Sequence, residues 1–181
     1  MNRRLFFAID LKDAANAASR EEIIALKHVM GKHGCTIPDD NLHITLAFLG
    51  NVDATQYDAC CQAADAIQLP SFTIHTTKTG FFTKPQILWL GIAQSPSLAR
   101  LVTPIQAIRR TVLGQSDTHS YLPHISLLRK AQPLKDDVDL RTSLQVKYFG
   151  LYASEPSPTG RGVQYICLNR WALTGASPLE R

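Results

Sequence analysis

The chain has 181 residues, of which 45% are hydrophobic, so it has enough apolar material for a packed core and does not resemble a disordered chain. Its formal net charge is +4 at pH 7 with a pI near 9.0, a mildly basic balance that suits an anionic ligand such as RNA or a nucleotide. No window approaches eighteen uninterrupted apolar residues, so we expect no membrane span. The four cysteines form no C-x-x-C pair, which predicts reduced thiols and a cytoplasmic protein.

The expected elements, taken in chain order, mix strands with amphipathic helices. We expect strands over residues 4–11, 41–50, 72–77, 87–92, 121–129, 144–153 and 163–173. Gly80, Phe81 and Phe82 are expected to follow a turn. We expect helices over residues 13–30 and 54–67, and a third helix that starts after Ser95–Ser97 and ends at Gly114. The polar segments 115–120, 130–139 and 154–162 are predicted to be loops.

A weak internal repeat runs through this order. A strand, a helix and a strand that carries a histidine occur once over residues 5–50 and again over residues 87–129. The repeat predicts an α+β fold with two pseudo-symmetric lobes of mainly antiparallel sheet, helices on the outside and a central cleft. We expect residues 1–181 to form a single bilobal domain.

The two histidine strands carry matching motifs: His-Ile-Thr-Leu at residues 43–46 and His-Ile-Ser-Leu at residues 124–127. Residues i and i+2 of a strand point to the same face, so each motif places an imidazole beside a hydroxyl. Two imidazoles across a ligand suit general acid–base catalysis because both protonation states are accessible near pH 7. The hydroxyls of Thr45 and Ser126 would donate hydrogen bonds to phosphate oxygens.

The paired motifs resemble the two-histidine (2H) phosphoesterase superfamily, and within it the bacterial RNA 2′,3′-cyclic phosphodiesterases, historically called 2′-5′ RNA ligases. The resemblance covers essentially the whole chain. Its supporting stretches are residues 4–11, 41–50, 123–129, 151–154 and 170–174. The departure is Ser126 where threonine is more usual, and this change keeps the hydroxyl.

The resemblance implies a metal-independent hydrolase, without a cofactor, that opens a ribose 2′,3′-cyclic phosphate at an RNA end to a 2′-phosphate. It makes His124 the general base and His43 the general acid, although the sequence leaves the reverse assignment open. It also allows reversible 2′-5′ ligation without ATP, and the chain has no Walker A sequence. We expect a monomer that acts in the cytoplasm and binds no membrane.

The resemblance further implies nucleobase contacts by Phe48 and Arg129, each five residues after its histidine. In a regular strand an odd offset turns a side chain to the opposite face, so Phe48 joins the site only if a bulge or loop breaks the alternation after Ala47. Core packing for Phe48 and a solvated charge for Arg129 are the alternatives.

Other residues have plainer interpretations. The aromatic residues Phe6, Phe7, Trp89 and Trp171 are assigned to the core. Lys84, Arg161 and Arg170 are solvated charges or contacts to RNA phosphates. The remaining histidines, His28, His33, His75 and His119, lack a partner motif; His119 alone is close enough to the second motif to lie at the cleft rim.

Two alternatives compete with a two-histidine hydrolase. A catalytic zinc needs about three protein ligands, and neither motif offers a close Cys, Asp or Glu. A non-catalytic RNA- or nucleotide-binding module on the same scaffold would not need an acid–base pair of histidines.

Overall fold

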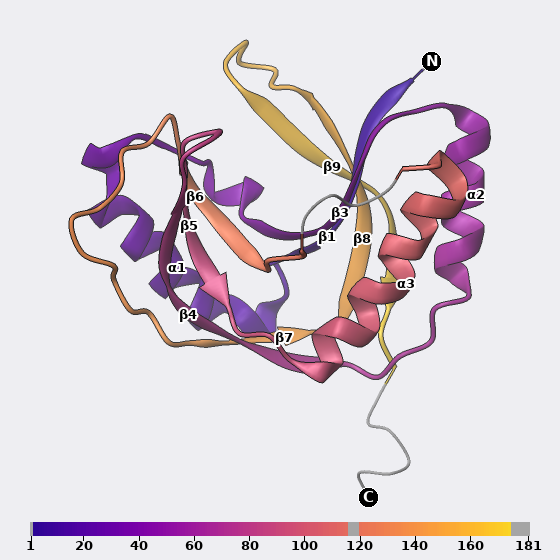
Figure 1. The fold of residues 1–181 in the computed structure, drawn as a ribbon, viewed down its shortest axis with the longest axis horizontal. Helices are drawn as coiled ribbons and strands as arrows, with labels where there is room; N and C mark the ends of the chain where they lie inside the picture. Colours follow the sequence, from indigo (N-terminus) through magenta and orange to yellow (C-terminus); the bar gives the residue numbers. More distant parts are fainter. Residues whose placement is uncertain (1, 116–119, 175–181) are drawn as a thin grey trace, which may run out of the picture.

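One curled antiparallel sheet organises the computed structural model, which describes residues 2–115 and 120–174 (Figure 1). His119 and most of the predicted loop 115–120 lie outside the described residues. The strands are β1 (Arg3–Asp10), β2 (Cys35–Thr36), β3 (His43–Val52), β4 (Phe72–Phe82), β5 (Ile87–Ile92), β6 (His124–Arg129), β7 (Ser143–Val146), β8 (Tyr148–Pro156) and β9 (Val163–Ala172). Their order across the sheet is β7-β4-β5-β6-β3-β1-β8-β9, with β2 paired to β6.

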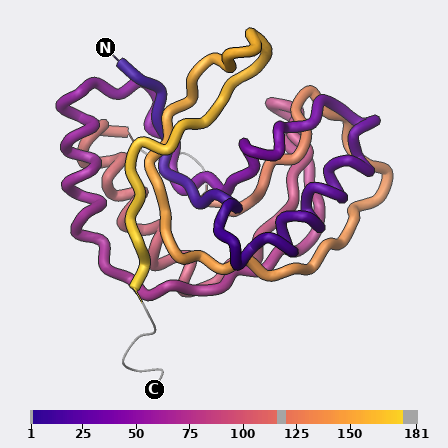
Figure 2. The backbone as a smooth tube through the Cα atoms, turned by 180° about the vertical axis from the view of Figure 1, so that it is seen from behind, coloured from indigo at the N-terminus to yellow at the C-terminus, as the bar shows by residue number. Residues whose placement is uncertain are grey.

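Among the described residues, three α-helices cover the outside of the curl. They are α1 (Ala17–Val29), α2 (Ala54–Asp65) and α3 (Pro96–Leu113). Helix α1 lies behind the β4–β6 half, whereas α2 and α3 pack together beside β3 and β9 of the other half (Figures 1 and 2). The predicted period of α3 is confirmed: Leu98, Leu101, Ile105 and Ile108 are all buried. Within the described ranges, no helix combines the length and apolar character that a membrane span requires.

The predicted repeat corresponds to β1–α1–β3 and β5–α3–β6. The predicted α+β class with two lobes and outer helices is confirmed. The structure adds that the lobes are halves of one sheet. They meet where β3 and β6 lie side by side, joined through the single residue pair Ile44 and Ile125.

Four local predictions need correction. Residues 144–153 form two strands, because β7 pairs with β4 and β8 pairs with β1 at the other side of the sheet. Strand β4 is continuous from Phe72 to Phe82, since its first part pairs with β7 and its second with β5. Strand β8 extends to Pro156 in a hairpin with β9, which shortens the predicted loop 154–162. The two-residue strand β2 has too little sequence to show a pattern and was not predicted.

The hydrophobic core continues through the joint between the halves. Ile44, Leu46, Ile125 and Leu127 have no measurable exposure and belong to the cluster that also contains the buried faces of α1 and α3. This continuity supports the expected single domain over residues 1–181, which stays a prediction. All four cysteines are free thiols, of which Cys60 is fully buried.

Candidate active site

The two histidine strands have the same pattern of exposure over their first six residues. In each, the histidine and the hydroxyl residue are half-buried, the isoleucine between them is buried, the next two residues are buried, and the sixth is exposed. Two consecutive buried residues cannot occur in a strand that alternates regularly between a core face and an open face. Both strands therefore change face after the hydroxyl residue.

Matching β-bulges cause this change. On β1, Phe7 pairs with Ala47 and Ala8 pairs with Thr45, which leaves Leu46 as an extra residue. On β5, Leu88 pairs with Leu128 and Trp89 pairs with Ser126, which leaves Leu127 as the extra residue of β6. Each bulge lies three residues after its histidine. The predicted break in β3 was after Ala47, and the bulge is one residue earlier, at Leu46. The residues five positions after the histidines, Phe48 and Arg129, are thereby turned toward the histidine face.

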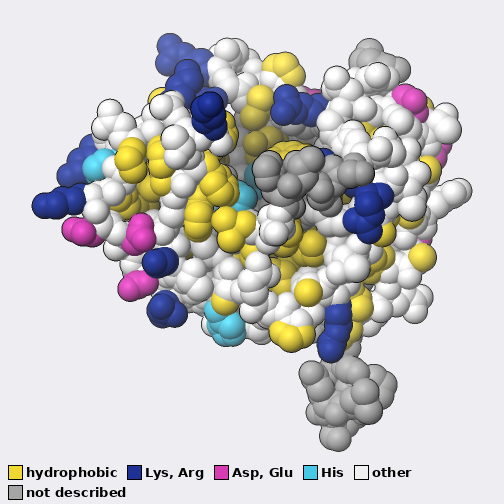
Figure 3. Space-filling view, in the orientation of Figure 1, with side chains coloured by type: hydrophobic (Ala, Val, Ile, Leu, Met, Phe, Trp, Pro, Cys, Tyr) yellow, Lys and Arg dark blue, Asp and Glu magenta, His cyan; other side chains and the backbone are white. Residues whose placement is uncertain are grey.

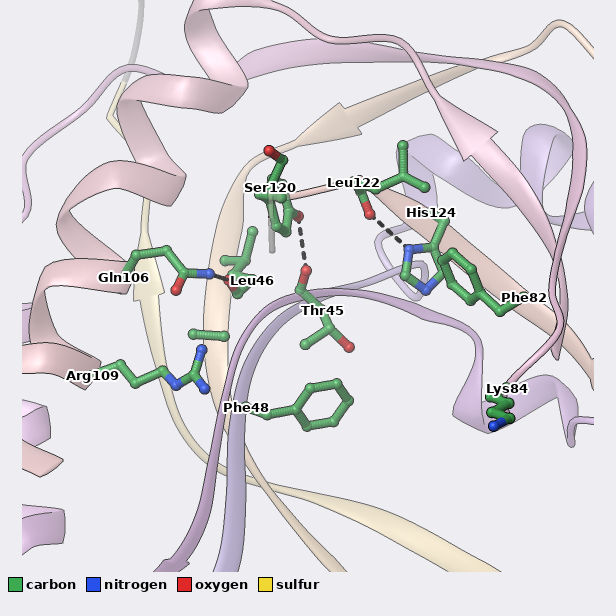
Figure 4. Close-up of a pocket in the computed structure, with 12 residues that line it drawn as sticks. Thr45, Leu46, Phe48, Phe82, Lys84, Gln106, Arg109, Ser120, Leu122 and His124 are labelled. Carbon is green, nitrogen blue, oxygen red and sulfur yellow. Dashed lines mark hydrogen bonds between the residues drawn. The ribbon is translucent and has the colours of Figure 1, made fainter. Parts of the chain in front are cut away.

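The backbone carbonyl groups at the bulges have specific donors. Gln106 Nε2 of α3 donates to the Leu46 carbonyl at 2.6 Å, and the Tyr121 hydroxyl donates to the Thr45 carbonyl at 2.8 Å (Figure 4). In β6 the Leu127 carbonyl accepts from the Ile37 amide at 2.9 Å. Burial raises the pKa of Tyr121, which keeps its hydroxyl protonated as a donor. Sequence reasoning missed Gln106 and Tyr121, because nothing in a local pattern marks a donor to a distant bulge.

The pairing of β3 with β6 brings the predicted residues together. Because Ile44 faces Ile125 in an antiparallel pair, the same register puts His43 opposite Ser126 and Thr45 opposite His124. We call these four side chains the motif square. Its two histidines lie on one diagonal and its two hydroxyls on the other, so the four side chains surround one centre.

Each imidazole is anchored by the backbone two residues before it. His43 Nδ1 lies 2.7 Å from the Asn41 carbonyl, and His124 Nδ1 lies 2.7 Å from the Leu122 carbonyl. A carbonyl only accepts, so each Nδ1 carries the hydrogen and each neutral ring presents Nε2 as its acceptor. The Thr45 hydroxyl then donates to His43 Nε2, 2.9 Å away. Ser126 makes no hydrogen bond to a described residue through its hydroxyl.

Aromatic rings hold both imidazoles in place. His43 lies 5.1 Å from the ring centres of Phe6 and of Tyr165. His124 lies 5.0 Å from the ring of Phe82 and 5.8 Å from that of Trp89. Phe6 is buried as predicted, but it packs in a small separate cluster on the histidine face. Because Phe6 lies in an unbroken apolar run, the sequence does not show that β1 has one side toward the histidines.

Burial shifts both imidazoles toward the neutral form. It lowers the pKa of His43 to about 4, while the Asn41 carbonyl and the Asp10 carboxylate act in the opposite direction and the charge of His124 lowers it further. Burial also lowers the pKa of His124, against the effect of the Leu122 carbonyl. Both rings therefore favour the neutral form at pH 7.

A cavity of about 620 Å³ opens at the Thr45–His124 end of the motif square. Phe48 lines it and is 59% exposed, and Lys84 and Arg109 supply positive charge (Figure 4). No carboxylate is among its described lining residues. Figure 3 shows this face hollowed in the middle, with apolar side chains inside and Lys and Arg side chains around it. The size and lining suit a ligand with an apolar ring and a negative charge.

Arg129 lies elsewhere. It is not among the lining residues of this cavity, and its Nη2 is 3.4 Å from the point where a Cβ on Gly162 would lie. Because β3 and β6 run in opposite directions, the residues that follow each motif diverge, so Phe48 and Arg129 lie at opposite ends of the motif square. The structure does not bring these two side chains together around one base.

No three His, Cys, Asp or Glu side chains converge as a metal site within residues 2–115 and 120–174. The donor set at the motif square is two imidazoles and two hydroxyls. This set fits hydrogen bonding and proton transfer, and it lacks the third nitrogen, sulfur or carboxylate ligand that a catalytic zinc uses.

Comparisons with known proteins identify the family to which the chain is similar. A family model described as LigT-like phosphoesterase matches residues 13–89. The chain is 38% identical to the RNA 2′,3′-cyclic phosphodiesterase of Escherichia coli K12 over 95% of this chain and 97% of that protein. Solved structures of E. coli LigT in the apo form, with ATP and with 3′-AMP are similar to it, with TM-scores of 0.83, 0.83 and 0.81. They are 36%, 35% and 36% identical, and each match covers 96% of this chain and 98%, 99% and 98% of the other.

The donor to the β3 bulge can be tested by substitution. Gln106→Leu would keep the size of the side chain and leave the Leu46 carbonyl without its donor, so we expect the free energy of unfolding to fall by about 1–3 kcal/mol. Urea denaturation measures this change. Gln132→Leu, at an exposed position, is the matched control and should change stability little. Equal stability of Gln106→Leu and Gln132→Leu would show that the bulge does not depend on this donor.

The lowered pKa values predict the titration of the site. In an NMR titration of the imidazole C–H signals, His43 should have a midpoint near pH 4 and His124 one below 6.5. Inorganic phosphate should raise both midpoints, because a bound anion favours imidazolium. Spectra of His43→Ala and His124→Ala assign the two signals. Midpoints at or above 6.5 without phosphate would contradict the neutral site.

Proposed function

The chain belongs to the LigT-like phosphoesterase family, and from that premise we propose that it is an RNA 2′,3′-cyclic phosphodiesterase. It would hydrolyse a ribose 2′,3′-cyclic phosphate to a 2′-phosphate by two-histidine general acid–base catalysis, without a metal. The observation that carries the proposal is the motif square, in which the Ile44–Ile125 register sets two anchored imidazoles on one diagonal and two hydroxyls on the other.

The shape of the substrate supports His43 as the acid. In a ribose 2′,3′-cyclic phosphate, the base is on C1′ next to C2′, whereas C4′ and the 5′ chain lie next to C3′. A base that enters the 620 Å³ cavity against Phe48 therefore points O2′ toward the His124 end. O3′ then faces His43, which suits protonation of O3′ as it leaves. The attacking water must approach opposite O3′, on the side where His124 lies.

The reaction then balances with these two groups. His124 Nε2 removes a proton from water as the water oxygen attacks phosphorus. The P–O3′ bond breaks, and the Nε2–H of His43 gives its proton to O3′. Each proton transfer contributes roughly 10²- to 10⁴-fold to the rate. Proton exchange with solvent returns both imidazoles to their starting states.

Substrate binding allows His43 to take up the proton it needs from solvent. The anionic phosphate favours imidazolium and raises the low pKa of His43. A protonated Nε2 no longer accepts from the Thr45 hydroxyl, so that hydroxyl becomes free to donate to a phosphate oxygen. Ser126 offers the second hydroxyl across the motif square. Anion binding, protonation of His43 and hydrogen bonding by Thr45 would thus be coupled.

The outer contacts differ between the two ends. We propose that Phe48 packs against the nucleobase, in line with its position on the cavity. Arg129 also stays a predicted nucleobase contact, but its place at the opposite end makes a phosphate the better fit for its guanidinium. We further propose a cytoplasmic monomer that needs no ATP. A solved structure of E. coli LigT contains ATP, so binding of ATP does not test whether the reaction needs it. The relevant measurement is turnover in the absence of ATP.

The central test uses adenosine 2′,3′-cyclic phosphate in EDTA without ATP. We expect hydrolysis to adenosine 2′-phosphate, and a fall in kcat of about 10²-fold or more for His43→Ala and for His124→Ala, because each removes one proton transfer. His28→Ala, an exposed histidine of α1, is the matched control and should behave as wild type.

Each other result would point to a different account. Loss of activity in EDTA would indicate a metal, and near wild-type turnover of both histidine variants would contradict the mechanism. A 3′-phosphate product would contradict the placement of O3′ next to His43. Tight binding of the cyclic nucleotide without turnover would favour the non-catalytic binding module.

A further inference from the structure

A second cavity of about 470 Å³ lies on the same concave side, over β1, β8 and β9. Its lining residues share no member with those described for the first cavity: Asp10, Lys12, Asp13, Tyr148, Tyr152, Tyr165, Cys167 and Arg170. Its volume is within the range of small-molecule sites, roughly 300–1,000 Å³. The proposed reaction gives it no role.

The second cavity lies next to the His43 end of the motif square, because its lining residue Tyr165 contacts His43. A small pocket of about 20 Å³ is lined by His43 as well. That pocket shares four residues with the second cavity: Asp10, Lys12, Tyr152 and Tyr165. The ring of Tyr165 also packs edge-on against His43. The motif square therefore has a cavity at each end, one beside His124 and one beyond His43.

The carboxylates of the second cavity are occupied by protein donors. Asp10 accepts from the hydroxyls of Tyr148 at 2.6 Å and Tyr152 at 2.7 Å, and from the Lys12 amide at 2.9 Å. Asp13 accepts from the Ala15 amide and lies 3.7 Å from Lys147 Nζ. These contacts hold both carboxylates in place, and Lys12 and Arg170 of the same lining offset their negative charge.

The cations, in contrast, remain available. The ammonium of Lys12 has no hydrogen-bond or ion-pair partner among the described residues, and its side chain is exposed. The guanidinium of Arg170 stacks 4.4 Å above the centre of the Tyr148 ring, which leaves N–H groups at its edge for an acceptor. Two cations beside tyrosine rings form a surface for a phosphate and an aromatic base.

The connectivity of ribose determines which part of a bound RNA would reach the second cavity. With the base of the reacting nucleotide in the first cavity, C4′ and C5′ extend past O3′ toward His43. The chain that continues from the 5′ oxygen leaves the motif square at that end, where the second cavity begins.

We propose that the second cavity binds the nucleotide on the 5′ side of the reacting RNA end, with Lys12 and Arg170 contacting its phosphate. The proposal rests on the proposed function and narrows its substrate class. The preferred substrate is an RNA or oligonucleotide end of at least two nucleotides, and a mononucleoside cyclic phosphate uses only half of the site.

The test compares adenosine 2′,3′-cyclic phosphate with the dinucleotide adenylyl-(3′→5′)-adenosine 2′,3′-cyclic phosphate. For each enzyme we measure the ratio of kcat/KM for the dinucleotide to kcat/KM for the mononucleoside, which cancels differences in active protein. We expect wild type to favour the dinucleotide, and Lys12→Ala and Arg170→Ala each to lower the ratio by about three- to tenfold through loss of a charged contact. Lys135→Ala, an exposed lysine of the 130–139 segment, is the matched control and should keep the wild-type ratio.

Three results would go against the proposal in distinguishable ways. A wild-type enzyme that hydrolyses both substrates equally well would overturn the second subsite and leave the proposed function standing. A dinucleotide preference that survives in both Lys12→Ala and Arg170→Ala would do the same, because the preference would arise elsewhere. Failure of wild type to hydrolyse either substrate would contradict the proposed function, and this inference with it.

Discussion

The pairing of Ile44 with Ile125 is the contact on which the site depends. It is the one residue pair of the β-ladder between β3 and β6 within the described residues, yet it sets the relative position of all four motif side chains. A shift of one residue in this register would turn one motif from the concave face into the core. The complete burial of both isoleucines opposes such a shift, since it would carry a histidine and a hydroxyl into an apolar interior. Apolar packing on one face thus fixes the geometry of the polar groups on the other.

The bulges extend this constraint from the motifs to the substrate contacts. A regular β3 would send Phe48 into the core and remove its ring from the lining of the first cavity. The extra residue Leu46 prevents this, but it disturbs the ladder and leaves carbonyl groups that need donors. Gln106 and Tyr121 supply them from α3 and from the segment before β6, so the second repeat unit holds the bulge of the first in place. In β6 a main-chain amide, that of Ile37, has the corresponding role.

Burial of the imidazoles has a cost and a use. Burial against aromatic rings lowers their pKa values, so the site holds two neutral rings with defined tautomers at pH 7. A neutral His124 is ready to act as a base, while His43 becomes an acid when an anion binds beside it. The two ends of the motif square also differ in charge: the cavity beside His124 has Lys84 and Arg109 and no carboxylate among its described lining residues. The cavity beyond His43 has Lys12 and Arg170 together with two carboxylates, those of Asp10 and Asp13. Such a difference gives a pseudo-symmetric scaffold a direction along which an asymmetric chain such as RNA can bind.

The sequence by itself determined the parts that depend on local periodicity. The alternation of a strand places His43 with Thr45 and His124 with Ser126, and the period of a helix identifies the buried residues of α3, because both are properties of consecutive residues. The repeat of strand, helix and histidine strand was also readable, and it predicted two lobes. Only the tertiary structure decided that the lobes form one sheet, that residues 144–153 divide between its two sides, and that Phe48 and Arg129 lie at opposite ends of the motif square. Register, bulges and their donors join residues that are far apart in the chain, such as Leu46 with Gln106 and Ile44 with Ile125. A local sequence pattern does not show which distant residue will donate to an unpaired carbonyl or bury an isoleucine.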